Sequence, residues 1–167
     1  ITAQNTNGVQ KTFPLSTSLV EDQLSSVFED FAIDSVKIGM LHNREIVIAV
    51  SNVLEIYKPK FVVLDPVMVS SSGCILMEKN AISVVVETLF PHCTLVTPNL
   101  DEAISIVSTV GSKHLFTKDN DSGVDETNFI NVIKHGAHNI HELGAKNVLI
   151  TGVSLDDSKN QNSKKSS

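Results

Sequence analysis

FVVLDP at residues 61–66 and TLVTPNLDE at residues 94–102 are the two segments that decide the fold of this chain. Each contains a short apolar run and then changes abruptly to polar residues around a proline. Runs of this length, apolar on both faces, are typical of parallel strands that are covered by helices on each side. Ligands bind to such sheets in the crevice beyond the carboxyl ends of the strands. Because the polar residues of both segments fall at that edge, we look there first for a functional site.

Strand and helix patterns alternate along the rest of the chain. The spacing of apolar residues predicts helices at about residues 16–31, 43–57, 79–90, 100–108 and 126–143, and strands at residues 1–3, 35–38, 61–64, 94–96 and 147–150. Residues 79–90 are ambiguous, because SVVV at residues 83–86 also suits a strand, but the apolar stripe favours a helix. Polar loops are expected at residues 4–8 and 111–123. The alternation predicts a three-layer α/β/α fold around a mainly parallel central sheet.

The composition limits the possible classes of protein. The chain has 167 residues, of which 41% are hydrophobic, which suits one domain with an aliphatic core. Its net charge of −6 gives no electrostatic footprint for nucleic acid or an anionic membrane surface. No apolar run approaches the roughly 20 residues that span a bilayer, and the two isolated cysteines fit a cytoplasmic protein with free thiols. Residues 154–167 are polar, so we expect a disordered tail after a domain at residues 1–153.

Two carboxylates are the main candidates for chemistry. Asp65 directly follows a buried strand, where it could hold Mg²⁺ through water, although Asp-Pro is also common in turns. Asn99 and Glu102 have the spacing of a helix cap, in which the Glu side chain accepts from the amide of the first residue. A helix N-terminus also attracts anions. Glu102 could therefore face Asp65 across the crevice and share a metal with bound phosphates, and the two interpretations of Glu102 are compatible.

Other polar segments give weaker signals. The small residues at 70–73 and at Thr151 and Gly152 could approach phosphate through their backbone amides, but neither segment matches a known phosphate-binding loop. Histidines at positions 135, 138 and 141 could suggest a metal site. Helical spacing places the first two opposite the apolar stripe, so a solvated face is favoured over metal binding.

Five segments taken together resemble one protein family. They are TAQNT at residues 2–6, VKIGML at 36–41, DPVMV at 65–69 with SG at 72–73, TPNLDEA at 97–103 and LGAKNVL at 143–149. In this order and spacing they resemble the hydroxymethylpyrimidine/phosphomethylpyrimidine kinases of thiamine biosynthesis, which belong to the ribokinase-like superfamily. The resemblance covers residues 1 to about 152. It implies a ribokinase-like α/β/α fold and the ATP-dependent phosphorylation of hydroxymethylpyrimidine and then of its monophosphate.

The resemblance also implies how the substrate would be held. Gln4 would hydrogen-bond the edge of the pyrimidine, while Met40 and Val67 would wall the pocket for its ring. The implied partners are a small pyrimidine and ATP, with neither nucleic acid nor a membrane. A pyridoxine or pyridoxal kinase, with a similar Asp and Asn-x-x-Glu layout, is the nearest alternative, although TAQNT at residues 2–6 favours the pyrimidine. A non-catalytic remnant that only binds a ligand is the alternative outside the enzymes.

On the phosphate side, the resemblance implies that Asp65 and Glu102 hold Mg²⁺ around the phosphates of ATP. Asn99 would lie beside them, and Thr151 and Gly152 would line the nucleotide site. Phosphoryl transfer depends on positioning and charge neutralisation more than on covalent chemistry, and these residues supply groups of both kinds. All five positions lie at the predicted binding edge.

Two parts of the family pattern have no counterpart in this sequence. The glycine-rich first strand would precede Ile1, and the Gly-Thr-Gly-Cys stretch that carries the activating residue would follow Ser154. We therefore expect a kinase domain that is truncated at both ends, has no catalytic residue of its own and is inactive alone. Apolar surface at the truncated edges should favour aggregation or a homodimer.

Overall fold

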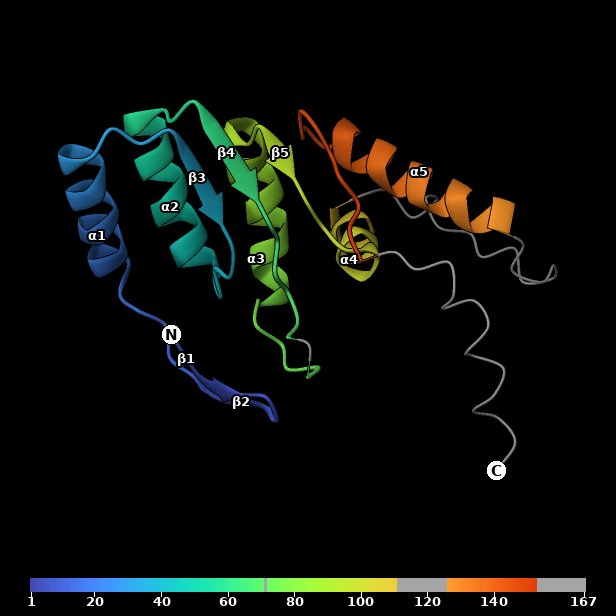
Figure 1. Ribbon diagram of the computed structural model, residues 1–167, viewed down its shortest axis with the longest axis horizontal. Helices are drawn as coiled ribbons and strands as arrows, with labels where there is room; N and C mark the ends of the chain where they lie inside the picture. The colour runs from blue at the N-terminus through green and yellow to red at the C-terminus, as the bar shows by residue number, and fades with distance from the viewer. Residues whose placement is uncertain (71, 111–125, 153–167) are drawn as a thin grey trace.

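The computed structural model describes residues 1–70, 72–110 and 126–152 of the chain (Figure 1). Its strands are β1 (Thr2–Asn5), β2 (Gly8–Thr12), β3 (Ser35–Ile38), β4 (Phe61–Leu64) and β5 (Leu95–Val96). Its α-helices are α1 (Thr17–Asp30), α2 (Arg44–Tyr57), α3 (Lys79–Val84), α4 (Leu100–Val110) and α5 (Glu126–Glu142). The predicted loop at residues 111–123 and the predicted tail at residues 154–167 lie outside the described residues.

The main sheet is parallel, with the strand order β3-β4-β5. Because both crossovers move in the same direction across the sheet and such crossovers are right-handed, α2 and α3 lie on the same face. The packing of α3 against both α2 and α4 agrees with this arrangement (Figure 1). The predicted α/β fold with a parallel sheet is confirmed. A helical layer on the opposite face remains a prediction.

The two faces of the sheet differ in burial. Along β3 and β4, Ile38, Val62 and Leu64 point into the core and are at most 5% exposed. Strand residues alternate between faces, so Lys37 and Phe61 lie on the opposite face, and both are exposed. The core beneath the helices is mainly aliphatic, as the composition predicts, with Phe90 as its one fully buried aromatic side chain among the described residues. Each fully buried large side chain stabilises the core by about 1.5–3 kcal/mol. Among the described residues, no helix is both long and apolar enough to cross a membrane.

Local capping chemistry sets the ends of several helices. The Asn43 side chain accepts a hydrogen bond from the Ile46 amide at 3.0 Å and starts α2. The Ser16 hydroxyl accepts from the Leu19 amide at 3.3 Å and starts α1. Gly144 follows α5 with a φ of +109°, a conformation that favours glycine at a helix end.

Residues 79–92 are helical, which resolves the ambiguity in favour of the apolar stripe. The segment continues from α3 into a π-helical turn at Val85–Leu89 and a 3₁₀ turn at Phe90–His92. The stripe that favoured a helix is buried on the core side, at 6% exposure or less: Ile82, Val85, Val86 and Leu89. The helical spacing of these buried apolar residues therefore outweighs the strand propensity of SVVV.

The first residues form a hairpin rather than a strand of the main sheet followed by a loop. β1 pairs antiparallel with β2 in a separate two-stranded sheet, with Thr2 opposite Thr12. The predicted loop at residues 4–8 was wrong, because its first two residues extend β1 and its last residue starts β2. Only Thr6 and Asn7 turn, with the Asn7 amide donating to Asn5 Oδ1 at 2.9 Å. Such short polar turns close hairpins, and the mixed polar composition of β2 hid the second strand.

The predicted buried strand at residues 147–150 is only partly realised. The segment runs parallel to β5 through isolated bridges, with the Leu149 amide donating to the Val96 carbonyl at 3.0 Å. Its side chains alternate between half-buried and exposed, and Leu149 is 54% exposed. Among the described residues, the segment therefore makes isolated bridges on one edge and leaves one of its faces exposed, instead of forming a regular strand with two buried faces.

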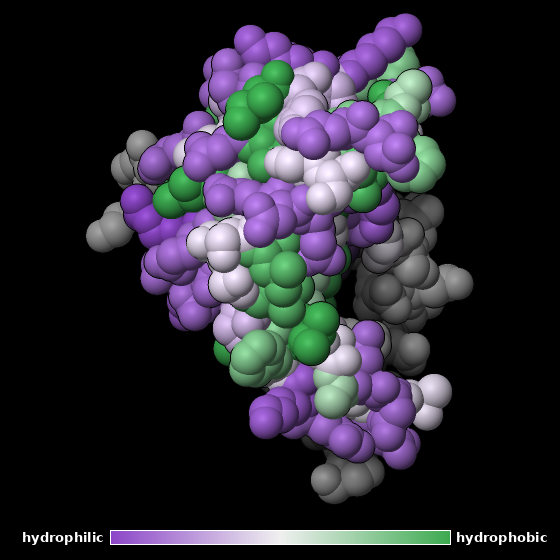
Figure 2. Space-filling view, turned by 90° about the vertical axis from the view of Figure 1, so that its left-hand side faces the viewer, coloured by the Kyte–Doolittle hydropathy of each residue, from purple (hydrophilic) through white to green (hydrophobic). Residues whose placement is uncertain are grey.

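Helix α1 packs against the outer side of α2. None of its residues is buried, in contrast to those of α2. The Phe28 and Tyr57 rings stack with centroids 4.7 Å apart and join the two helices. Val27 and Phe31, which belong to the predicted apolar stripe, are 47% and 62% exposed. Figure 2 looks onto this side of the molecule and shows hydrophobic side chains among the hydrophilic ones on its surface.

The two cysteines should differ in reactivity. Cys93 is fully buried, and desolvation raises the pKa of its thiol to about 12 although Lys146 opposes the shift. Cys74 is only half-buried. A disulfide reagent at pH 8 should therefore titrate one thiol in the native chain and two in denaturant, since only the thiolate reacts. Cys74→Ser should leave no reactive thiol in the native chain; rapid labelling of that variant would contradict this packing.

Candidate functional site

Asp65 lies at the carboxyl edge of the sheet, as predicted. Its amide donates to the Ile38 carbonyl at 2.9 Å, so the ladder between β3 and β4 extends to this residue. The Val67 amide then donates to the Asp65 carbonyl at 2.8 Å, which turns the chain sharply around the buried Pro66. The Asp65 side chain is 33% exposed, and its Oδ2 accepts a hydrogen bond from Lys37 Nζ at 2.9 Å. The carboxylate is therefore accessible at the rim.

Glu102 lies in the first turn of α4 and is 6% exposed. The predicted cap is present: the Asn99 amide donates to Glu102 Oε2, and the Glu102 amide donates to Asn99 Oδ1, both at 2.9 Å. Glu102 Oε1 also accepts from the Met68 amide at 3.4 Å. One carboxylate thus joins the start of α4 to the loop after β4, only three residues beyond Asp65.

The surroundings of Glu102 raise its pKa above the ordinary value. Burial is the largest cause, and the hydrogen bonds from the Asn99 and Met68 amides act in the opposite direction. The negative charges of Asp65 and Asp101 raise the pKa further. The Met68–Glu102 hydrogen bond, made three residues after Asp65, is the contact that brings the segments of both carboxylates to the same edge of the sheet.

The predicted nucleotide-side residues also come together. Thr151 bridges Asn99 in parallel fashion, and its amide donates to the Pro98 carbonyl at 2.9 Å. Gly152 follows with a φ of +64°, a conformation that favours glycine. A Cβ added at Gly152 would lie 3.6 Å from the Asn99 Cβ. Asn99, Thr151 and Gly152 therefore line one stretch of the rim beside Glu102.

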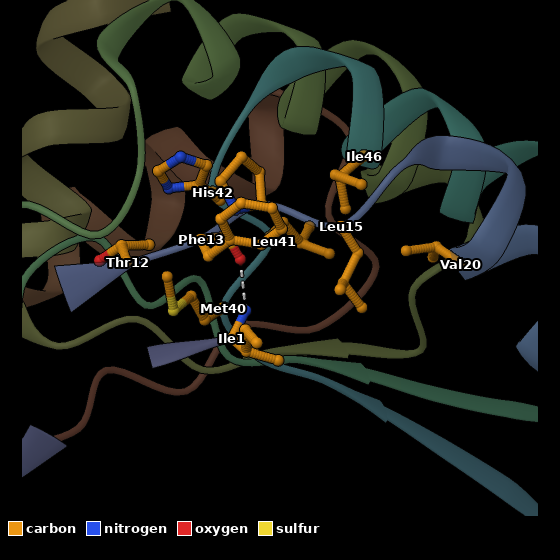
Figure 3. Close-up of a pocket in the computed structure, with 10 residues that line it drawn as sticks. Ile1, Thr12, Phe13, Leu15, Val20, Met40, Leu41, His42 and Ile46 are labelled. Carbon is orange, nitrogen blue, oxygen red and sulfur yellow. Dashed lines mark hydrogen bonds between the residues drawn. The ribbon is translucent and has the colours of Figure 1, made fainter. Parts of the chain in front are cut away.

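The predicted substrate-side residues do not share one pocket. Met40 lines a cavity of about 120 Å³ beside the end of β2 and the start of α2 (Figure 3). The other lining residues are Ile1, Thr12, Phe13, Pro14, Leu15, Val20, Leu41, His42 and Ile46. Gln4 is exposed on β1 opposite Val9, and Val67 is half-buried; neither lines this cavity.

Within the described part of the chain, no three His, Cys, Asp or Glu side chains group closely enough to hold a metal by themselves. The solvated face predicted for His135 and His138 is confirmed, since both are exposed. At the rim, Asp65 offers an accessible carboxylate, and Glu102 offers a second one whose oxygens also accept from backbone amides. Carboxylate oxygens are the ligands that Mg²⁺ prefers. Two carboxylates fit Mg²⁺, because this ion usually keeps several waters and takes its remaining ligands from phosphates.

Comparisons with known proteins agree with this arrangement. The family model described as phosphomethylpyrimidine kinase matches residues 1–165. The chain belongs to the phosphomethylpyrimidine kinase family. It is 35% identical over 155 residues to the hydroxymethylpyrimidine/phosphomethylpyrimidine kinase of Aquifex aeolicus, covering 93% of this chain and 54% of the relative.

Two solved structures show the same fold in this family and in a related one. The crystal structure of phosphomethylpyrimidine kinase from Clostridium difficile has a TM-score of 0.71 and 34% identity, covering 93% of this chain and 60% of that one. An ADP complex of Bacillus subtilis pyridoxal kinase has a TM-score of 0.67 and 28% identity, covering 90% and 51%. This phosphomethylpyrimidine kinase family member thus spans between about half and 60% of the length of these three proteins.

Sequence reasoning missed two groups at the rim of this family member. Lys37 stands in the apolar strand pattern as its only charged residue, and that signal could have placed it on the polar face beside Asp65. The Met68 amide carries no sequence signal, because its role depends on how the loop after β4 folds back toward α4.

Removing the Glu102 carboxylate should loosen this edge. Glu102→Ala leaves the Met68 and Asn99 amides without their acceptor, and we expect a loss of about 2 kcal/mol in the free energy of unfolding. Asp101→Ala removes an exposed carboxylate from the neighbouring position and should cost less than about 1 kcal/mol. Urea unfolding at pH 7 measures both. Equal effects in the two variants would show that the carboxylate does not join the segments.

The stabilities of the unaltered chain and of a Glu102→Gln variant should differ in their dependence on pH. Because the folded pKa of Glu102 is raised, the folded chain keeps this proton at a pH at which the unfolded chain has lost it. Stability from this group therefore falls as the pH rises from its ordinary pKa of 4.5 to the raised value and is constant above. Glu102→Gln should remove that part of the pH dependence. An unchanged profile in the variant would contradict the raised pKa.

Proposed function

We propose that this protein takes part in thiamine biosynthesis by phosphorylating hydroxymethylpyrimidine and its monophosphate with ATP. The observation that carries the proposal is the convergence of Asp65 and Glu102, from two different segments, on the carboxyl edge of a parallel sheet. Ligands of such sheets bind at this edge. Family membership supports the choice of substrate, and the ADP complex of the Bacillus subtilis pyridoxal kinase supports nucleotide binding in a related fold.

Asp65 is the residue that we propose contacts Mg²⁺ directly. Its carboxylate is accessible, and among the described residues only Lys37 bonds to its side chain. Both oxygens of Glu102 already accept from backbone amides, so this carboxylate would act through water while it holds the edge in place. When bound, Mg²⁺ would neutralise charge on the transferring phosphoryl group.

The nucleotide phosphates would lie against Asn99, Thr151 and Gly152. Helix α4 starts at this point, and the positive end of its dipole faces the rim. Gly152 exposes its backbone without a side chain beside Asn99, which suits close approach of a phosphate. These residues would position the phosphates, and the helix dipole would offset part of their negative charge. Positioning and charge neutralisation are most of what phosphoryl transfer requires from a protein.

The substrate side supports a further part of the proposal, that these 167 residues alone do not turn over the pyrimidine. A cavity of about 120 Å³ at Met40 is below the roughly 300 Å³ of typical ligand pockets. Gln4 and Val67 lie outside it, so the described structure offers no common pocket in which the three residues would contact one pyrimidine. The exposed side chains of Phe61 and Leu149 also support association of two copies, which light scattering would test.

Pyridoxal phosphorylation is the second candidate, because the ADP complex in the comparison is that of a pyridoxal kinase with the same fold. Competition between hydroxymethylpyrimidine and pyridoxal for the chain separates the two. We expect the pyrimidine to compete more strongly, since the match to the phosphomethylpyrimidine kinase family covers residues 1–165. Stronger binding of pyridoxal would favour the second candidate.

Calorimetric titration with Mg–ATP tests the phosphate edge. Asp65→Asn should weaken binding about tenfold or more, because it removes the accessible carboxylate, while Asp101→Asn removes the same charge nearby and should leave binding within about twofold. Equal losses in both variants, or no binding of Mg–ATP to the unaltered chain, would contradict the proposed site.

A coupled ADP-release assay on the same samples should show no turnover above background, and clear turnover would overturn the proposed inactivity.

A further inference from the structure

Lys37 is a charged residue of the candidate site that the proposed function leaves without a role. It occupies the third position of β3, opposite Val63 of β4 in the parallel register. Since strand residues alternate between faces, Lys37, Val63 and Asp65 share the face away from the core. That register brings Lys37 Nζ within 2.9 Å of Asp65 Oδ2, at the carboxyl edge of the sheet.

Stability does not explain this ion pair. The Lys37 side chain is 67% exposed and the Asp65 side chain 33% exposed, and ion pairs in such settings contribute little to folding. The other ion pairs among the described residues both involve Glu55 of α2, away from this edge. Lys37 is therefore the one ammonium that the described structure pairs with a carboxylate of the candidate site.

The charges at this edge decide how a metal cation would bind Asp65 while Lys37 is paired with it. The Met68 amide links Glu102 to the loop that carries Asp65, and Asp101 directly precedes Glu102, so this edge gathers three carboxylates. In agreement with this, the charges of Asp65 and Asp101 raise the pKa of Glu102. Glu102 is already occupied by backbone amides, so an arriving cation meets Asp65 with Lys37 bound to it. A divalent cation and an ammonium repel each other when they bind the same carboxylate. The long, flexible lysine stem allows the ammonium to leave without moving the strand.

We propose that Lys37 is a positioning residue: it holds the Asp65 carboxylate at the rim while no metal is bound and gives it up to the divalent cation. The released ammonium then lies free to attract the phosphates of the nucleotide that arrives with the metal. This inference rests on the proposed function, because it takes Asp65 as the direct ligand. It adds an exchange of cations on Asp65, in which Lys37 opposes metal binding alone and favours binding of the metal–nucleotide complex.

Binding of Mn²⁺, measured by electron paramagnetic resonance on the 167-residue chain, tests the exchange without any assay of turnover. Lys37→Met removes the competing ammonium and should tighten binding of Mn²⁺ alone about three- to tenfold. The same variant should weaken binding of Mn–ATP about threefold or more. Lys60→Met is the matched control, since Lys60 precedes β4 at the opposite end of the strand, and both affinities should stay within about twofold.

A double-mutant comparison assigns the effect to Asp65. In an Asp65→Asn background, Lys37→Met should change the affinity for Mn²⁺ by less than twofold, because no carboxylate remains for the two cations to share. Circular dichroism and urea unfolding should show that all variants are folded. The proposal is overturned if Lys37→Met leaves Mn²⁺ binding unchanged or weakens it, or if Lys60→Met has an equal effect. Absence of Mn²⁺ binding in the unaltered chain would instead refute the metal site of the proposed function, and the exchange with it.

Discussion

The buried carboxylate of Glu102 is the constraint on which the rest of the site depends. It belongs to α4, but it accepts hydrogen bonds from the Asn99 amide at the helix start and from the Met68 amide in the loop after β4. Burying a charged group is costly unless its oxygens are satisfied. The two amides meet that requirement only when both segments are in place. The loop that carries Asp65 and the helix start that carries Asn99 are therefore held together at the sheet edge.

Local chemistry made much of this edge predictable from the sequence. The Asn99–Glu102 spacing identified the cap, and the change from an apolar run to Asp65 located the end of β4, because both features arise within a few residues of the chain. The bonds that cross between segments were not predictable in the same way. The contact of Lys37 with Asp65 depends on the register of two strands, and the contact of Met68 with Glu102 depends on the path of a loop.

The remaining misjudgements have similar causes. The second strand of the hairpin is mixed in polarity and short, so its pairing with β1 decides its structure more than its own composition does. Residues 147–150 have the apolar composition of a buried strand, yet they and Thr151 meet β5 and the segment after it only through isolated bridges, a pairing that depends on chain segments far apart in the sequence. The substrate residues inferred by resemblance, Gln4 and Val67, stay apart from the cavity at Met40, whereas the phosphate-side residues are gathered. The phosphate half of the site is thus the better defined half.

Paramagnetic broadening of backbone amide signals by Mn²⁺–ATP, followed by nuclear magnetic resonance, tests directly whether this edge is where metal and nucleotide meet. The account predicts strong broadening for the amides of Asp65, Met68 and Asn99 and for Thr151. It predicts little broadening at Lys146, near the opposite end of the sheet. Broadening centred on Lys146, or spread evenly over the chain, would contradict a metal–nucleotide site at the carboxyl edge.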